Sequence, residues 1–177
     1  GDFIYPIVSS DEIYIVGVET SDLKTIKQYD ESGNTVKVLY VNDELITWLD
    51  YDYERNYLLI NSNKFVDLNT GEETIIAEIT DTIGKYIVSD VSFKNGKIIN
   101  NYISTEVLLM DTSNYDNEKT RKIRINIANR EYEVLENVIG ILSSDGLKYA
   151  SGYPHSVLIT DTLGEWINNV EFEGDEL

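Results

Sequence analysis

The stretch LSSDGLKYASGYPHSVLITDTLGE, residues 142–165, determines the fold that we predict. Two runs rich in Leu, Tyr, Val and Ile, at 147–153 and 156–161, are typical of short β-strands. A Ser-Asp-Gly turn precedes the first run, and Thr-Leu-Gly-Glu follows the second. Together with the apolar residues on either side, the stretch predicts four short antiparallel strands joined by hairpins.

The same pattern recurs along the whole chain, and convincing helical periodicity is absent. Four groups of short strands have the approximate boundaries 2–43, 44–79, 84–127 and 132–173. We expect the third strand of each group to end on an aspartate followed by a turn containing Gly, Asn or Ser, at Asp30, Asp67, Asp111 and Asp161. In the third group we expect a turn at 94–96 (KNG) and a loop at 112–120.

Repetition at this period predicts a single all-β domain over residues 1–177, built as an array of about four four-stranded antiparallel sheets. Residues 142–165 resemble the blade motif of TolB-like and WD40-like β-propellers, and residues 57–73 resemble a shorter version of it. The first and third groups match more loosely, and the Trp-Asp dipeptide of WD40 blades is missing. The resemblance implies a β-propeller-like array.

The number of repeats leaves three arrangements open. Members of the resembled family have six to eight blades, whereas this sequence supplies about four. The sheets could close a small ring, form part of a larger propeller that is truncated or completed by a second chain, or stack as a β-sandwich. An open array would expose strand edges that favour pairing with another chain.

The composition narrows the function classes. The chain of 177 residues has a formal charge of −18. This charge repels phosphate groups and therefore disfavours binding to nucleic acid or anionic lipid. The absence of cysteine excludes disulfides and thiolate chemistry. No apolar run of about 18 residues predicts a membrane span. No signal peptide is recognisable, and the start at Gly1 without Met admits a processed N-terminus.

The segment DYDYE, residues 50–54, carries three carboxylates in five residues. An EF-hand loop starting at Asp50 would need Gly and Glu where the sequence has Arg55 and Asn61. Strand alternation predicts instead that the three carboxylates share one face, with the tyrosines on the other, before a turn. Two interpretations remain, a solvated surface strand or a cation site, with calcium as the candidate, formed by Asp50, Asp52 and Glu54.

Three more residues are candidates for contact with a ligand or partner. His155, the only histidine, lies in a predicted loop, and no G-x-S-x-G segment presents a serine to it. We expect Trp48 in the core and Trp166 at an interface or a sugar-stacking surface. The predicted binding residues are therefore Trp48, Asp50, Asp52, Glu54, His155 and Trp166, and no catalytic residue is predicted.

The run EKTRKIRIN, residues 118–126, is the only basic run, and on a strand Lys122 and Arg124 would line one face. It favours either a docking patch for an acidic partner or charge that protects a sheet edge from pairing.

The sequence thus favours a non-catalytic binding or assembly module, extracellular or at the cell envelope, without a cofactor other than calcium. We expect a protein partner or self-association, with carbohydrate as an alternative ligand. The alternatives are a propeller domain or fragment of a larger hydrolase whose catalytic residues lie outside this chain, and a self-assembling structural subunit of a surface.

Overall fold

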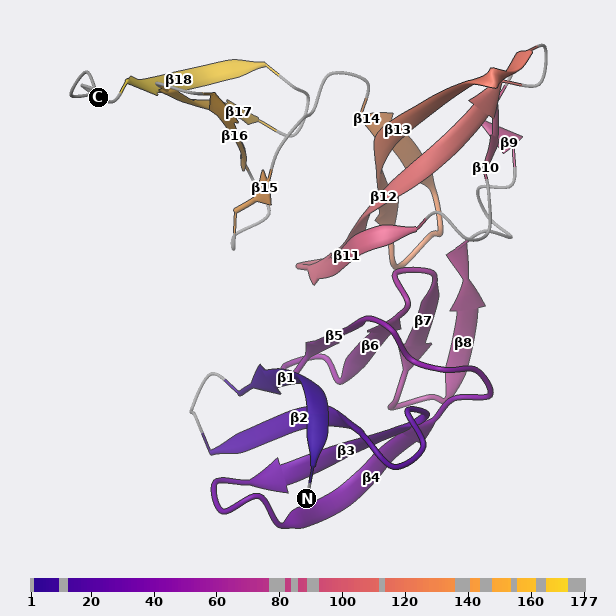
Figure 1. The fold of residues 1–177 in the computed structure, drawn as a ribbon, viewed down its shortest axis with the longest axis vertical. Coiled ribbons are helices and arrows are strands. Elements are labelled where there is room, and N and C mark those ends of the chain that lie inside the picture. Colours follow the sequence, from indigo (N-terminus) through magenta and orange to yellow (C-terminus); the bar gives the residue numbers. More distant parts are fainter. Residues whose placement is uncertain are drawn as a thin grey trace.

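The computed structural model describes residues 2–9, 13–76, 82–83, 86–88, 93–111, 114–135, 141–143, 148–153, 156–161 and 165–171. In these residues the protein is all-β, as predicted, and its strands form four antiparallel sheets that follow one another along the chain. The first sheet lies at the bottom of Figure 1 and the fourth at the top left, so that the sheets form an open arc and not a closed ring.

Three sheets have four strands in sequence order, which is the up-and-down topology of a propeller blade. The first sheet comprises β1 (Phe3–Val8), β2 (Tyr14–Glu19), β3 (Thr25–Asp30) and β4 (Thr35–Val41). The second comprises β5 (Leu49–Asp52), β6 (Tyr57–Ile60), β7 (Lys64–Asp67) and β8 (Glu72–Ile75). The fourth comprises β15 (Ile141–Leu142), β16 (Lys148–Tyr153), β17 (Ser156–Asp161) and β18 (Trp166–Glu171).

The third sheet has six strands and differs from the four-stranded prediction. Its strands are β9 (Thr82–Ile83), β10 (Tyr86–Val88), β11 (Lys94–Ile99), β12 (Tyr102–Asp111), β13 (Asn114–Asn126) and β14 (Tyr132–Leu135). Both β10 and β11 pair with β12, at opposite ends of this long strand, and together they take the place of the first strand of a four-stranded sheet.

Two expectations for the third sheet were wrong. The predicted KNG turn lies inside β11, where the pairing register shifts between Lys94 and Lys97 and Asn95 has a φ of 53°. Positive φ is well tolerated by Asn, so the segment forms a β-bulge instead of a hairpin. The predicted loop 112–120 is mostly strand, because β13 begins at Asn114 and pairs with β12.

The third unit also extends further than predicted, because β14 pairs with β13 and therefore belongs to the third sheet. Asp111 ends β12, so the strand that corresponds to β3, β7 and β17 ends instead at Asn126. The Oδ1 atom of Asn126 accepts a hydrogen bond from Ala128 N at 2.9 Å, as Oδ1 of Asp67 does from Asn69 N at 2.8 Å. An amide oxygen can cap this turn in the same way as a carboxylate oxygen.

The second sheet lies in the core of the arc, with both faces buried. Leu58, Ile60 and Val66 pack in the cluster that contains the first sheet. Leu59 and Phe65 pack in the cluster that contains the third. Successive side chains of a strand point to opposite faces, so a sheet that is covered on both sides needs continuous apolar runs such as YLLI in β6.

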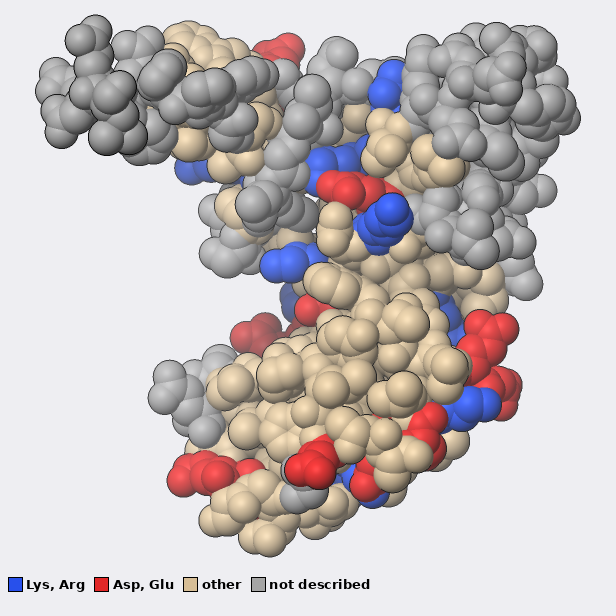
Figure 2. Space-filling view, viewed as in Figure 1, with Lys and Arg blue, Asp and Glu red and all other residues tan. Residues whose placement is uncertain are grey.

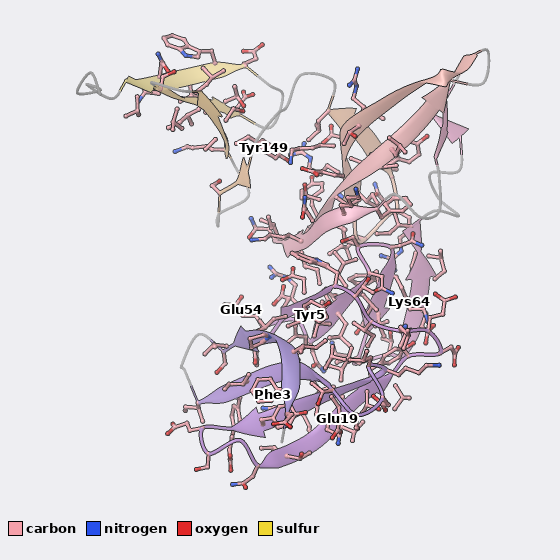
Figure 3. The ribbon with its side chains drawn as sticks, viewed as in Figure 1. Phe3, Tyr5, Glu19, Glu54, Lys64 and Tyr149 are labelled. Carbon is pink, nitrogen blue, oxygen red and sulfur yellow. The ribbon has the colours of Figure 1, made fainter. Side chains whose placement is uncertain are left out.

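The fourth sheet joins the third through Tyr149, which is 1% exposed and packs with Leu135. Figure 3 shows Tyr149 on the side of the fourth sheet that faces the third. The basic run contributes to this junction, since Lys122 Nζ lies 5.2 Å from the centre of the Tyr149 ring. Because β13 lies between β12 and β14, the interpretation of this run as protection of a sheet edge was wrong.

Candidate functional site

The segment 50–54 fastens the second sheet to both of its neighbours. Asp50 lies on the side of β5 toward the third sheet, and its Oδ2 accepts a hydrogen bond from Ile98 N at 2.7 Å. Burial raises the pKa of the Asp50 carboxyl, while this hydrogen bond opposes the rise. On the other side, Tyr53 donates its hydroxyl hydrogen bond to Ile7 O in the first sheet, at 2.9 Å.

Asp52 ends β5 and shapes the turn that follows. Its Oδ1 accepts hydrogen bonds from Glu54 N and Arg55 N, at 2.9 and 3.1 Å, and its Oδ2 lies 2.8 Å from Arg55 Nη1. Glu54 lies in the turn and is exposed (Figure 3). The three carboxylates therefore do not converge, and within the described ranges no three His, Cys, Asp or Glu side chains are placed to hold a metal ion. Calcium binding stays a prediction.

The two tryptophans lie in different surroundings. Trp48 is half-buried at the junction of the second and third sheets, where its Nε1 donates a hydrogen bond to Gly96 O at 2.9 Å. Trp166, on β18, is 67% exposed. His155 lies outside the described residues. The geometry thus gives Trp48 and Asp50 a role in holding sheets together, and their predicted contact with a ligand stays a prediction.

The two end sheets of the arc each have apolar side chains that no neighbouring sheet covers. On the first sheet, Val38 and Val41 are 54% and 61% exposed and lie opposite Lys27 and Thr25, on the face away from the second sheet. On the fourth sheet, Val170 is 40% exposed and lies opposite Val157, on the face away from Tyr149, whereas Trp166 lies opposite Thr160 and therefore on the same face as Tyr149. We call these two surfaces the end faces.

A groove between the second and third sheets has a cavity volume of about 530 Å³, and we call it the inter-sheet groove. Its lining combines arginines, aromatic rings and carboxylates from the turns of both sheets: Arg55, Tyr57, Phe65, Asp67, Glu72, Asn101, Ile127, Ala128 and Arg130. On the face shown in Figure 2, Lys and Arg gather over the third sheet, while Asp and Glu predominate over the first two sheets.

Three turns near this groove share one backbone pattern. In each, the fifth residue donates its N–H to the carbonyl oxygen of the first, from Asn56 to Asp52, from Gly71 to Asp67 and from Arg130 to Asn126. The fifth residues have φ values of 62°, 76° and 61°, which is the left-handed region. Gly and Asn adopt it readily, whereas for Arg it costs about 1–2 kcal/mol.

Other contacts hold the Arg130 side chain in the groove. Its guanidinium carbon lies 5.2 Å from the centre of the Phe65 ring, its Nη1 donates to Ile127 O, and its Nη2 lies 3.1 Å from Glu72 Oε1. Tyr57 meets the Phe65 ring edge-on at 5.1 Å. The Arg130 guanidinium therefore covers the Phe65 ring, which is 1% exposed and forms an aromatic floor beneath it.

The sequence analysis did not identify Arg55, Arg130 or the aromatic floor as a site. One signal was available, because Arg130 follows Asn126 at the same spacing at which Gly71 follows Asp67. Recognising it required the correct end of the third strand, which the prediction had placed at Asp111.

No model of a known protein family matches the sequence, and no curated protein sequence matches it. Among solved structures, the chain is similar to the tricorn protease, with a TM-score of 0.55 and 14% identity over 89% of this chain and 16% of that chain. It is also similar to the β-propeller domain of Cps50 (Swd1) from Myceliophteria thermophila, with a TM-score of 0.52 and 12% identity over 97% of this chain and 60% of that chain.

These similarities concern the fold alone. The four antiparallel sheets are the blades of an open β-propeller array. The chain spans less than two thirds of each of these two proteins. Within the part of the chain that the structure describes, no helix is long and apolar enough to cross a membrane.

Proposed function

We propose that this protein is a non-catalytic β-propeller segment that binds protein partners and whose open arc is completed by further blades. The two end faces carry this proposal. Between the second sheet and its neighbours, the corresponding surfaces are covered and lie in apolar clusters. On the end faces, Val38 and Val41 remain more than half exposed and Val170 is 40% exposed. Exposed apolar surface of this kind is typical of interaction sites.

The likeness to solved propellers supports the same proposal, because this chain matches 60% of a β-propeller domain and leaves the rest without a counterpart. On the basis of its hairpin turns, we propose that the chain is related to the TolB-like and WD40-like propellers. The completing blades would come from the same polypeptide or from a second copy of this chain. An extracellular or cell-surface location and a carbohydrate ligand stay predictions.

Light scattering after size-exclusion chromatography tests the role of the end faces. We expect the chain to form a discrete dimer or larger species, and the double variant Val38→Lys, Val41→Lys to be monomeric. Leu45→Lys is the matched control, since Leu45 is 53% exposed but lies in the loop after β4. A wild-type chain that is monomeric at every concentration would contradict completion by a second copy of this chain, as would equal dissociation by the control.

A second candidate function follows from the likeness to the tricorn protease. In that case the chain would be a propeller domain of a larger hydrolase, with the catalytic residues elsewhere in that protein. The two candidate functions differ in which further domains would accompany this chain. Both predict that this chain alone hydrolyses no substrate.

A further inference from the structure

We infer that a pocket between the loop after β4 and the second sheet binds a primary ammonium group, the lysine side chain of a protein partner. This inference rests on the proposed binding of protein partners and names the group of the partner that is recognised. The pocket, which we call the Asn42 pocket, has a cavity volume of about 250 Å³. Its lining includes Asn42, Asp43 and Glu44 from the loop and Lys64 and Ile75 from the second sheet.

The side-chain oxygen of Asn42 is the first reason to regard this pocket as a site. Asn42 is 4% exposed, and its Oδ1 has no hydrogen-bond partner among the described residues. Its Nδ2 donates to Glu44 O at 2.9 Å, which fixes the orientation of the amide group. A buried acceptor without a partner destabilises the folded protein. A donor that enters the pocket and bonds Asn42 Oδ1 therefore removes this penalty.

The carboxylates of the loop favour a donor that is positively charged. Asp43 and Glu44 are exposed, and in the part of the chain that the structure describes neither carboxylate takes part in a hydrogen bond or an ion pair. Lys24 Nζ donates to the backbone oxygen of Asp43, at 2.5 Å, and not to its carboxylate. The cation in the lining, Lys64, is already paired with Glu73 Oε2 at 3.0 Å. The pocket therefore has two negative charges without a partner.

The number of acceptors favours an ammonium group over a metal ion. A lysine ammonium has three N–H donors, and Asn42, Asp43 and Glu44 offer three side chains that can accept from them. Calcium needs about six to eight oxygen ligands, and within the described ranges no three His, Cys, Asp or Glu side chains are placed to hold a metal ion. The charge of Lys64 also repels a divalent ion more strongly than a monovalent one.

The size of the pocket favours a single side chain. Its volume lies below the usual range of small-molecule sites, about 300–1,000 Å³, so an oligosaccharide would not fit. It is also several times the roughly 30 Å³ that one water molecule occupies in the liquid, so a single water would not fill it. Ile75, which is half-buried, offers apolar contact to the methylene groups of a lysine.

The probe for the test is the peptide acetyl-Gly-Lys-Gly-amide, titrated at about 0.15 M salt so that the overall charge of −18 is screened. We expect chemical shift changes at the backbone amides of residues 42–44 and at the Asn42 Nδ2 group. The peptide acetyl-Gly-norleucine-Gly-amide keeps the apolar stem without the ammonium and should bind about tenfold more weakly or worse. Equal binding of the two peptides, or no change at Asn42 with either, would overturn the inference. Calcium chloride that binds the same residues more tightly than the lysine peptide would also overturn it, in favour of a metal site.

The double variant Asp43→Asn, Glu44→Gln is the informative one, because it removes both charges and keeps the shapes of two exposed side chains. We expect it to melt as the wild type does and to lose about tenfold or more in affinity for the lysine peptide. The matched control Glu31→Gln, Glu54→Gln removes the same charge from exposed turns before β4 and β6 and should leave binding unchanged. Wild-type affinity of the first variant, or an equal loss in the control, refutes the inference. The masses of both variants by light scattering report separately on the proposed assembly through the end faces.

Discussion

Replacing Gly96 by Ala is expected to loosen the junction between the second and third sheets. A Cβ atom at this position would lie 2.8 Å from Leu59 Cδ2, 2.8 Å from Ser62 Cβ and 2.9 Å from Ser62 Cα. The leucine methyl group can move, but the Ser62 backbone is held in a turn with a φ of 55°. One of the two sheets must therefore shift.

The expected loss of folding stability in Gly96→Ala has two parts. Overpacking of a close contact typically costs about 1–3 kcal/mol. The shift would also stretch the hydrogen bonds from Gly96 N to Ser62 Oγ and from Trp48 Nε1 to Gly96 O, now 2.8 and 2.9 Å long. Each contributes about 0.5–1.5 kcal/mol. The two parts sum to about 2–6 kcal/mol, which for a chain of this size lowers the melting temperature by roughly 4–24 °C.

Melting followed by circular dichroism and by tryptophan fluorescence measures this loss, in a Trp166→Phe background so that Trp48 is the only tryptophan. Gly71→Ala is the control that separates crowding from backbone strain. A Cβ at Gly71 meets nothing within 4 Å, but the φ of 76° is unfavourable for Ala, so we expect a loss of about 1–2 kcal/mol without a change at Trp48. If Gly96→Ala melts as the wild type does, the sheets are not in the close contact that we describe.

Two further changes test the sheet junctions. Burial raises the pKa of Asp50 above its ordinary value of 3.8, so the folded protein binds this proton more tightly than the unfolded chain does. The resulting gain in folding stability is fully present below pH 3.8 and is lost as the pH rises through the raised pKa. Asp50→Asn retains an acceptor for Ile98 N and should remove this pH dependence without lowering the melting temperature at pH 7. Asp50→Ala leaves Ile98 N without its acceptor and should lower the folding stability by about 1–3 kcal/mol. Melting curves of both variants and the wild type at pH 4 and pH 7 test these expectations. Tyr149→Ala removes the side chain between the third and fourth sheets, so amide exchange should accelerate in β16–β18 and stay unchanged in β5–β8, and uniform acceleration would contradict a local role.

The sequence predicted the fold where hairpin chemistry and strand periodicity act locally. Residues 148–153 and 156–161 form the paired strands that their Tyr, Val and Ile indicate, and Asp161 Oδ1 accepts a hydrogen bond from Glu165 N. The prediction failed in the third sheet, where a bulge and a turn have the same local composition. Only the pairing of β11 with the long β12 shows that Asn95 continues a strand, and this pairing is non-local.

The candidate residues illustrate the same limit. Alternation correctly placed Asp50 and Tyr51 on opposite faces of β5, but it did not show that both faces are covered by other sheets. Which carboxylate meets solvent and which meets a backbone N–H depends on how sheets stack. The groove was missed for the same reason, because Arg55 and Arg130 line one groove only through the packing of two sheets.

In an array of this kind, stability is approximately a sum over sheets and over the interfaces between neighbours. The second sheet shares buried clusters with both neighbours, whereas the fourth is joined through the small cluster of Leu135 and Tyr149. An open arc therefore has its weakest positions at its ends, where Val38 and Val170 also meet water. The charge of −18 keeps such exposed faces from associating without specificity. A further blade on either end face would add one apolar interface to the sum of stabilising interfaces. The addition of blades that would complete a ring would therefore also stabilise the fold.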